Sequence, residues 1–323
     1  MIGAEINYQA LDKQKVEAAK KHRDHQLIDL PDFTPGSEMY DPEAAKEEIK
    51  FSGLRTGFDD FDNNATYGFK PDEIVLFGAD TNLGKTAFAL HTAIMFACQG
   101  QKVVYFAAED SKRWLTRMFS RIIDQNDFII CGKTYKLEDF IDNIIFISEE
   151  QAIKFRSNKG ELRDLIYTLN SQGKCDWFFV DMLNNVVDPL QDKTIEDFMS
   201  TLRTDCGAYK FSVWFNCRFR EVDRSLRDEA QKREKSAPPI TRFYGKSGYT
   251  YSATKIITLA PFEGDSTLQT KTLRVLKNKE ALPGFDKFRY LVKWDKDLKF
   301  QQNELDSVSF VEADELFQEE NDT

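Results

Sequence analysis

The sequence predicts an α/β fold: a mostly parallel sheet with helices on both faces and antiparallel strands added at one edge. From Phe51 onwards, short apolar runs alternate with longer amphipathic stretches, which is the pattern of consecutive β-α-β units. Most of the apolar runs are continuous, as expected of strands that are buried on both faces. The last runs follow one another closely through turns such as Leu282-Pro283-Gly284, so they are expected to pair antiparallel at one edge.

Eight strands and three long helices are expected. The expected strands are Glu73–Phe77, Lys102–Ala108, Asn143–Ile147, Trp177–Val180, Ser212–Phe215, Lys255–Leu259, Thr272–Leu276 and Tyr290–Lys293. The expected helices are Lys85–Gln99, Ser111–Gln125 and Lys159–Gln172. These helices fall between the first four strands, and parallel neighbours need connections of that length.

The length of the chain bounds the number of domains. A chain of 323 residues fits one large α/β domain with appendages, because single cores stop growing near roughly 250–300 residues. Residues 1–50 are expected to form an exposed helix followed by a linker, since Leu30-Pro31 and Pro35-Gly36 interrupt regular structure there. Residues 51–303 are expected to form the α/β domain. Residues 304–323 are expected to form an acidic tail, because they contain eight acids and no Lys or Arg.

The charge balance is acidic, with 44 basic against 54 acidic residues and a net charge of −10. This balance argues against a general nucleic-acid coat protein, which carries a basic footprint, but it allows a small local basic site. The first 30 residues hold no apolar signal segment, and no apolar run approaches the roughly 20 residues that span a membrane. The five cysteines form no Cys-x-x-Cys pair, which argues against a zinc site and a disulfide framework and favours a cytoplasmic location.

The strongest motif is a phosphate-binding loop between an expected strand and an expected helix. Its residues are Ala79, Asp80, Thr81, Asn82, Leu83, Gly84, Lys85, Thr86 and Ala87. A nest of backbone N–H groups at a helix N-terminus favours an anion, so the loop is expected to bind nucleotide phosphates. Lys85 is expected to reach the β- and γ-phosphates, and the Thr86 hydroxyl is expected to bind Mg²⁺. Ala79 stands where the general pattern has its first Gly.

Two acids follow apolar strands. The strand Trp177–Val180 leads into Asp181, the Walker B arrangement, in which a bound Mg²⁺ compensates the charge of the acid. Glu109 follows the strand Lys102–Ala108 and is expected to orient or deprotonate an attacking water. Asp110 is the weaker candidate for that role. The structural alternative for Glu109 is an acid that is favoured at a helix N-terminus.

These segments together resemble the motor domain of DnaB-type bacterial replicative helicases and the related phage ring helicases, which is a RecA-like P-loop NTPase core. The resemblance is carried by three stretches, Arg55–Asp62, Tyr67–Glu73 and Asn82–Leu90. The first is similar to the family's T-G-F-x-x-L-D, the second to its G-G-L-x-P-G-D/E turn, and the third to its S-M-G-K-T-A-F-A-L. An Ala in the first loop position is common in the family, and Glu109 and Asp181 match its strand-end glutamate and its Walker B acid.

The resemblance implies further site residues. Asn216 stands where the family has a polar residue, often Gln, that senses the γ-phosphate; the shorter amide reaches less far, and a solvated strand end is the alternative. Leu276–Glu280 is similar to the family's K-x-R, whose basic residues reach the γ-phosphate of a neighbouring subunit. This assigns Lys277 to nucleotide binding and Lys279 to catalysis. Because lysine lacks the planar fork of the family's arginine finger, slower hydrolysis or dependence on a partner is expected.

The segment Arg218–Thr250 matches the DNA-facing loop of the family. It holds nine basic against five acidic residues, a local excess of positive charge in an acidic chain. Gly245–Gly248 resembles the family's R-E-S-G, which tracks DNA phosphates. The residues expected to contact DNA are Arg218, Arg220, Arg242, Gly245, Lys246, Ser247 and Gly248.

The leading interpretation is an ATP-driven, Mg²⁺-dependent helicase that forms a hexameric ring and translocates on single-stranded DNA, with a phage as the favoured source. The N-terminal helix is expected to dock on a neighbouring subunit. The acidic tail is expected to recruit a replication partner such as a primase, a polymerase or a loader, or to screen the basic channel when DNA is absent. A solvated tail without a partner is the alternative. Two alternatives stay open: a RecA-like recombinase or recombination mediator, and a P-loop assembly factor that binds nucleotide but hydrolyses it weakly.

Overall fold

The computed structural model describes residues 53–155, 159–186, 192–218, 247–262, 269–279 and 290–301. The strands are β1 (Ile74–Ala79), β2 (Val103–Ala107), β3 (Phe128–Ile130), β4 (Lys133–Tyr135), β5 (Ile144–Ile147), β6 (Trp177–Asp181), β7 (Ser212–Arg218), β8 (Lys255–Pro261), β9 (Thr270–Asn278), β10 (Tyr290–Trp294) and β11 (Phe300–Gln301). The α-helices are α3 (Asp59–Phe61), α4 (Lys85–Cys98), α5 (Lys112–Gln125), α6 (Leu137–Phe140), α7 (Glu149–Ala152), α8 (Lys159–Ser171), α9 (Asp192–Tyr209) and α11 (Ser247–Ser252). Short η helices, with other hydrogen-bond spacings, are η3 (Asp62–Thr66), η4 (Ile141–Asn143), η5 (Ile153–Phe155) and η6 (Leu183–Asn185).

The described strands form one nine-stranded sheet in the order β11-β10-β9-β8-β1-β7-β6-β2-β5, and β3 and β4 form a separate hairpin. β1 pairs in parallel with β7 on one side and β8 on the other, and the parallel order continues through β6 and β2 to β5. β9, β10 and β11 add antiparallel strands beside β8. The expected fold class is confirmed.

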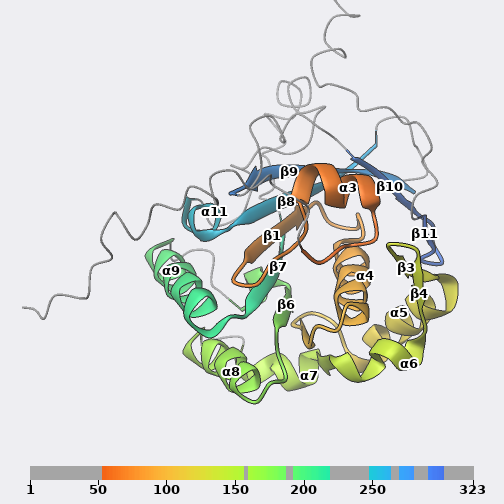
Figure 1. Ribbon diagram of the computed structural model, residues 1–323. Helices are drawn as coiled ribbons and strands as arrows, with labels where there is room; N and C mark the ends of the chain where they lie inside the picture. Colours follow the sequence, from red (N-terminus) through yellow and green to blue (C-terminus); the bar gives the residue numbers. More distant parts are fainter. Residues whose placement is uncertain are drawn as a thin grey trace, which may run out of the picture. The chain divides into compact units, whose positions relative to one another are not determined.

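Helices cover both faces of the sheet (Figure 1). Successive side chains of a strand point to opposite faces, so β1 serves two cores. Val75 and Phe77 pack on the face covered by α4 and α5. Ile74 and Leu76 pack on the face covered by α8 and α9. β1 is therefore buried on both sides, which explains its continuous apolar sequence.

The expected strands and long helices are all present, with bounds that differ by no more than three residues. The largest difference is at β7, which continues past Phe215 to Arg218 because β1 runs beside it and pairs Ala79 with Arg218. The β3–β4 hairpin was not expected, since strands of three residues give no periodic signal. Its turn uses Cys131 and Gly132, both with positive φ (50° and 78°), the geometry of a tight hairpin turn.

Helix α9 was also not expected, although its sequence carried a signal. Phe198, Met199, Leu202 and Cys206 are buried, and their spacing places them on one helical face against the sheet. The expected N-terminal helix and linker and the expected acidic tail lie outside the described residues. In the part of the chain that the structure describes, no helix is long and apolar enough to span a membrane.

A buried ion pair connects the residue before β1 to the start of β8. Lys255 Nζ donates to Glu73 Oε1, and the side chains are only 1% and 5% exposed. The Lys255 ammonium also lies 5.4 Å from the centre of the Phe69 ring. Either charge alone would lose its hydration without compensation, so each of the two residues requires the other.

Lys255→Met is expected to lower the free energy of unfolding by about 3–5 kcal/mol, because it removes the ammonium group that compensates the buried charge of Glu73. Urea denaturation followed by circular dichroism measures the loss. The matched control is Lys210→Met, which removes a solvent-exposed pair with Asp72 (2.7 Å) and is expected to cost less than about 1 kcal/mol. A second substitution, Glu73→Gln, in the Lys255→Met background is expected to restore part of the stability. Equal losses for the two lysine variants would contradict this account.

Candidate nucleotide-binding site

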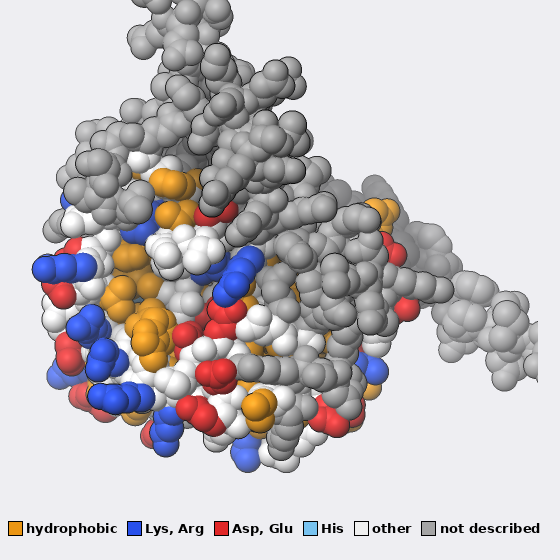
Figure 2. Space-filling view, turned by 180° about the vertical axis from the view of Figure 1, so that it is seen from behind, with side chains coloured by type: hydrophobic (Ala, Val, Ile, Leu, Met, Phe, Trp, Pro, Cys, Tyr) orange, Lys and Arg blue, Asp and Glu red, His pale blue; other side chains and the backbone are white. Residues whose placement is uncertain are grey.

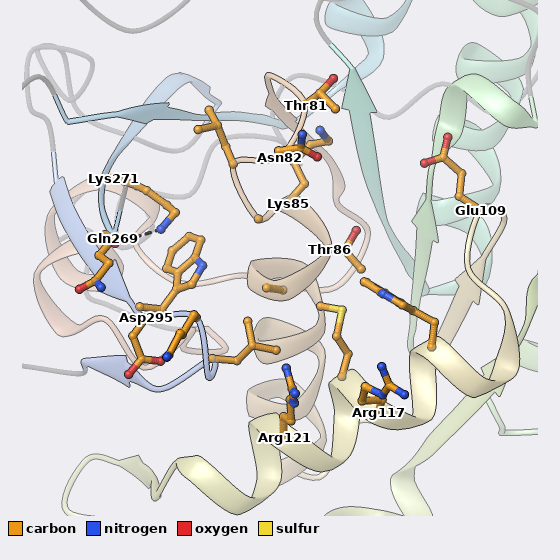
Figure 3. A pocket seen from close by; sticks show the side chains of 18 of the residues that line it. Thr81, Asn82, Lys85, Thr86, Glu109, Arg117, Arg121, Gln269, Lys271 and Asp295 are labelled. Carbon is orange, nitrogen blue, oxygen red and sulfur yellow. Dashed lines mark hydrogen bonds between the residues drawn. The ribbon is translucent and has the colours of Figure 1, made fainter. Parts of the chain in front are cut away.

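The carboxyl ends of the parallel strands meet at one edge of the sheet. The pairing Ala79↔Arg218 aligns the ends of β1 and β7, and the pairing Ala107↔Asp181 aligns those of β2 and β6. The loops that follow these strands line a pocket of about 710 Å³ that is open to solvent. Its wall includes the phosphate-binding loop from Thr81 to Ala87, and also Glu109 and Arg218 (Figure 3).

The phosphate-binding loop turns sharply between β1 and α4. Asn82 and Gly84 have positive φ (68° and 89°), and Lys85 is the first residue of the helix. Lys85 Nζ donates to the carbonyl oxygens of Ala79 (3.2 Å) and Asp80 (3.3 Å). Burial lowers the pKa of Lys85, and the charge of Asp181 opposes that change. The loop thus holds its lysine curled over the site where the expected phosphates would bind.

Asp181 ends β6 with its side chain almost fully buried (1% exposed). Tyr105 Oη donates to Asp181 Oδ2 at 2.9 Å, whereas Oδ1 is buried without a hydrogen-bond partner among the described residues. Burial raises the pKa of Asp181, and the polar side chains of Asn216 and Thr86 and the Lys85 charge act against the rise. A buried carboxylate beside a threonine hydroxyl fits a Mg²⁺ ion or its water ligands. Thr86 and Asp181 are the residues that would hold it.

Asn216 lies in the interior of β7, opposite Phe77 of β1, with 1% of its surface exposed. Trp214 Nε1 donates to its Oδ1 at 3.0 Å, and its Nδ2 makes no hydrogen bond of regular geometry with the described residues. The alternative of a solvated strand end is therefore wrong. Asn216 is not part of the wall of the pocket and lies beside Asp181 instead. A role at the γ-phosphate stays a prediction.

Glu109 follows β2 and points into the pocket from the side of β6 and β7 (Figure 3). Its Oε1 accepts hydrogen bonds from Asn185 Nδ2 (2.9 Å) and Arg218 Nη2 (2.7 Å). The neighbouring Asp110 has its pKa raised to about 7, because it is partly buried and lies near Asp181, Glu109 and Glu149. Of the two neighbouring acids, Glu109 is the one that lines the pocket, so it is the better base by position.

Lys277 and Lys279 lie on and just after β9, outside the wall of the pocket. Lys277 Nζ donates to the carbonyl oxygens of Thr250 (2.7 Å) and Tyr251 (3.0 Å), at the C-terminal end of α11. Burial lowers the pKa of Lys277 to about 8, and the charge of Lys279 adds to this effect. Lys279 is exposed. Neither group is placed to reach the phosphate-binding loop of its own chain.

Of the residues expected to contact DNA, the structure describes the side chain of Arg218 alone, and it places this side chain against Glu109. Ser247 and Gly248 begin α11. Arg220, Arg242, Gly245 and Lys246 lie outside the described residues. Contact with DNA therefore stays a prediction for this group.

Several residues of the pocket were not foreseen. Trp294 of β10 packs against the loop and against Phe88, and the Lys271 ammonium lies 3.9 Å from the centre of a Trp294 ring. Arg117 and Arg121 of α5 form the opposite wall (Figure 3). Basic side chains gather around hydrophobic ones on the side of the molecule where α5 lies (Figure 2). Only the pairing of β10 with β9 brings Trp294 to the loop, so no motif could have identified it.

Comparison with known proteins assigns the domain. Residues 53–196 match the family described as the DnaB-like helicase C terminal domain. The chain carries a RecA-like motor domain of the DnaB type. The matched stretch is similar to the helicase domains of that family. A search of curated proteins finds no sequence match.

Solved structures agree with this fold at low sequence identity. One of them, described as an ATPase domain, is 15% identical, with a TM-score of 0.59, and the match covers 91% of this chain and 99% of that one. A DnaB-like replicative helicase, described with its interactions with primase, is 15% identical (TM-score 0.60; 89% of this chain and 71% of that one). A KaiC-like protein from Pyrococcus horikoshii OT3 is 16% identical (TM-score 0.52; 75% and 94%). At such identities the likeness shows the fold alone.

Gly84 of the DnaB-type domain is expected to tolerate no side chain. A Cβ there would lie 2.9 Å from Cζ2 and Nε1 of Trp294, in a backbone conformation with φ 89°. Gly84→Ala is expected to lower the free energy of unfolding in urea by roughly 2–4 kcal/mol, from the left-handed backbone and the clash together. Gly100→Ala is the matched control, because Gly100 has φ 85° and open space around it, and it is expected to cost about 1 kcal/mol.

Adding Trp294→Phe to Gly84→Ala separates the two contributions, because the smaller ring removes the clash but not the backbone strain. The double variant is then expected to lose less than the sum of the single variants. Additive losses would mean that Trp294 does not confine the loop.

Proposed function

We propose that this chain is an ATP-driven, Mg²⁺-dependent DNA helicase motor that assembles into a hexameric ring and translocates on single-stranded DNA. The observation that carries the proposal is the convergence of Lys85, Thr86, Asp181 and Glu109 at one edge of a DnaB-type motor domain. Together they offer a cation for the phosphates, ligands for Mg²⁺ and an acid for the attacking water.

Each residue has a distinct role in hydrolysis. Lys85 leaves the carbonyl oxygens of the loop and binds the β- and γ-phosphates. Thr86 and Asp181 would hold a Mg²⁺ ion, which would supply positive charge to the phosphate oxygens. Glu109 orients the attacking water and accepts its proton. The amide groups of the loop and the N-terminus of α4 supply the remaining positive potential.

A second copy of the chain completes the site in this proposal. Lys277 and Lys279 lie outside the pocket of their own chain. They would therefore act on the γ-phosphate that is bound to a neighbouring subunit. Lys279 is the better candidate, because Lys277 already binds two carbonyl oxygens of α11. The need for a neighbour supports a closed ring rather than a monomer. Residues 1–50 would hold neighbouring subunits together.

Single-stranded DNA and a replication partner complete the proposed assembly. The basic stretch 218–250 would track DNA phosphates, and its affinity would therefore fall with salt. One structural relative is described with its interactions with primase. By analogy, the acidic tail 304–323 would bind a primase, a polymerase or a loader. We propose that a phage encodes this chain as a replication protein.

Lys85→Ala is expected to lower ATP turnover at least about a hundredfold, because the developing phosphate charge loses its cation. Glu109→Gln is expected to retain binding of ATP and Mg²⁺ and to hydrolyse ATP about 10²–10⁴ times more slowly, since an amide cannot accept the proton. Phosphate release measures turnover, and equilibrium dialysis measures binding. Lys112→Ala removes an exposed lysine outside the pocket and serves as the control. Turnover by Lys85→Ala close to that of the wild type would overturn the assignment of the loop.

Two assays on the wild-type chain test the proposed function against its rivals. A ring helicase is expected to hydrolyse ATP faster with single-stranded DNA and to unwind a forked duplex. A recombinase is expected to show the first activity without the second. An assembly factor is expected to bind nucleotide with little turnover under either condition. Native mass spectrometry in the same buffer is expected to give a hexamer, and a persistent monomer would contradict the ring.

Lys279→Ala is expected to reduce hydrolysis in the assembled ring and to leave nucleotide binding by isolated subunits unchanged. Mixing Lys279→Ala with Lys85→Ala subunits creates some interfaces in which both lysines are intact. Partial ATPase activity is therefore expected to return in the mixture, in proportion to such interfaces. No recovery in rings of proven mixed composition would refute the shared site.

A further inference from the structure

Arg218 ends β7 at the wall of the nucleotide pocket and pairs with Glu109. Its Nη2 lies 2.7 Å from Glu109 Oε1, and the same oxygen accepts from Asn185 Nδ2 at 2.9 Å. Because the arginine side chain is 51% exposed, the ion pair is open to the pocket and is worth little in stability. A pair of this kind exchanges readily for a stronger anion.

The position of Arg218 is set by the strand beside it. In the register of the sheet it lies opposite Ala79, the residue at which the phosphate-binding loop begins. Burial lowers the pKa of Lys85, and the nearby positive charge of Arg218 contributes to this lowering. Two cations therefore approach the same end of β1. Each now binds an oxygen of the protein, Lys85 at backbone carbonyls and Arg218 at a carboxylate.

The residue expected to sense the γ-phosphate, Asn216, lies beside Asp181 and behind the wall of the pocket. Asn216 is sealed in the sheet, does not line the pocket, and has its side-chain oxygen bound to Trp214. Arg218 lies two residues further along the same strand, so its side chain leaves the same face of the sheet at the open end. A guanidinium there reaches farther than an amide and offers two parallel donors to phosphate oxygens.

We propose that Arg218 is a γ-phosphate ligand supplied within the subunit, and that it exchanges Glu109 for the γ-phosphate when a nucleoside triphosphate binds. The inference rests on the nucleotide-binding part of the proposed function and does not require DNA or a ring. A diphosphate leaves Arg218 on Glu109. A triphosphate brings a multiply charged group that competes for the guanidinium through charge-assisted hydrogen bonds.

The exchange has two consequences for hydrolysis. Once Arg218 leaves, the Oε1 atom of Glu109 loses its charged donor and becomes a better acceptor for a proton from the attacking water. The guanidinium also provides, from within the subunit, the planar fork that Lys279 lacks. Arg218 is the first residue of the basic stretch 218–250, so one residue would link the state of the nucleotide to that stretch.

The test compares two nucleotides in the same variants. Isothermal titration calorimetry with Mg²⁺ measures binding of ADP and of a β,γ-imido ATP analogue, without DNA. Arg218→Ala is expected to weaken binding of the analogue about ten- to a hundredfold and to leave ADP binding unchanged. Arg218→Lys is expected to recover part of the loss, because it keeps the charge but not the fork. Arg113→Ala, an exposed arginine of α5 outside the pocket, is the control.

Competition with Glu109 gives a second readout that a structural role of Arg218 would not produce. Glu109→Gln is expected to tighten binding of the analogue about two- to fivefold, since the arginine no longer has to leave a charged partner. This gain is expected to vanish in the Glu109→Gln/Arg218→Ala double variant. A gain that persists without Arg218 would come only from reduced repulsion between Glu109 and the phosphate, and it would overturn the exchange.

The outcomes separate this inference from the proposed function. If the wild type binds both nucleotides and Arg218→Ala weakens them equally or not at all, Arg218 is not a γ-phosphate ligand and the phosphate-binding loop stands. If the wild type binds neither nucleotide, both the proposed function and this inference are wrong. Selective loss of the analogue, with ADP binding intact, supports the exchange.

Discussion

The site depends on the parallel alignment of β1, β2, β6 and β7. Parallel strands place their carboxyl ends on a single edge of a sheet, and the loops that leave this edge bring Lys85 and Glu109 to one pocket. β1 is buried on both faces and is hydrogen-bonded to β7 and β8 on its two sides. The chain therefore leaves the sheet through a sharp turn at the end of β1. That turn is the phosphate-binding loop. Antiparallel pairing of any of these strands would send its functional residue to the opposite edge.

The molecule handles buried charge in two different ways. Glu73 and Lys255 form a closed pair that neutralises itself and has no access to solvent, so it serves the fold. Asp181 and Lys85 are also buried, but neither is fully compensated: an oxygen of Asp181 lacks a partner in the described structure, and Lys85 binds neutral carbonyl groups. Incomplete compensation is a cost in the absence of ligand. A bound nucleotide with its Mg²⁺ would remove this free-energy cost, and the protein would therefore bind that ligand strongly.

Asp181 and Glu109 differ in the groups that donate hydrogen bonds to them. Tyr105 donates to Asp181 from inside β2 and fixes one of its oxygens. Asn185 and Arg218 hold Glu109 by one oxygen from the other side. Asp181, which would bind a cation, thus accepts a hydrogen bond from the neutral donor Tyr105. Glu109, which would accept a proton, is bound by the neutral Asn185 and by the positively charged Arg218. Glu109 is consequently the group whose state an incoming anion can change.

The sequence by itself determined the fold class, the strands of the sheet and the turn between β1 and α4. These features follow from local rules: apolar runs in β1 and β2 form strands buried on both faces, and Gly84 with Lys85 forms a turn that opens a helix. The positions of Glu109 and Asp181 could be predicted as well, because each is an acid at the end of an apolar strand. Local signals failed at β3 and β4, which are too short to show a period.

Tertiary structure alone decided the surroundings of these residues. Trp294 reaches the phosphate-binding loop only because β10 joins the sheet through β9, and Arg218 meets Glu109 only because β7 lies between β1 and β6. The burial of Asn216, which the sequence left open, follows from the same lateral packing. Sequence spacing specifies neighbours along one strand or one helix. Contacts between strands depend on the order and register of the whole sheet, which no single segment of the chain contains.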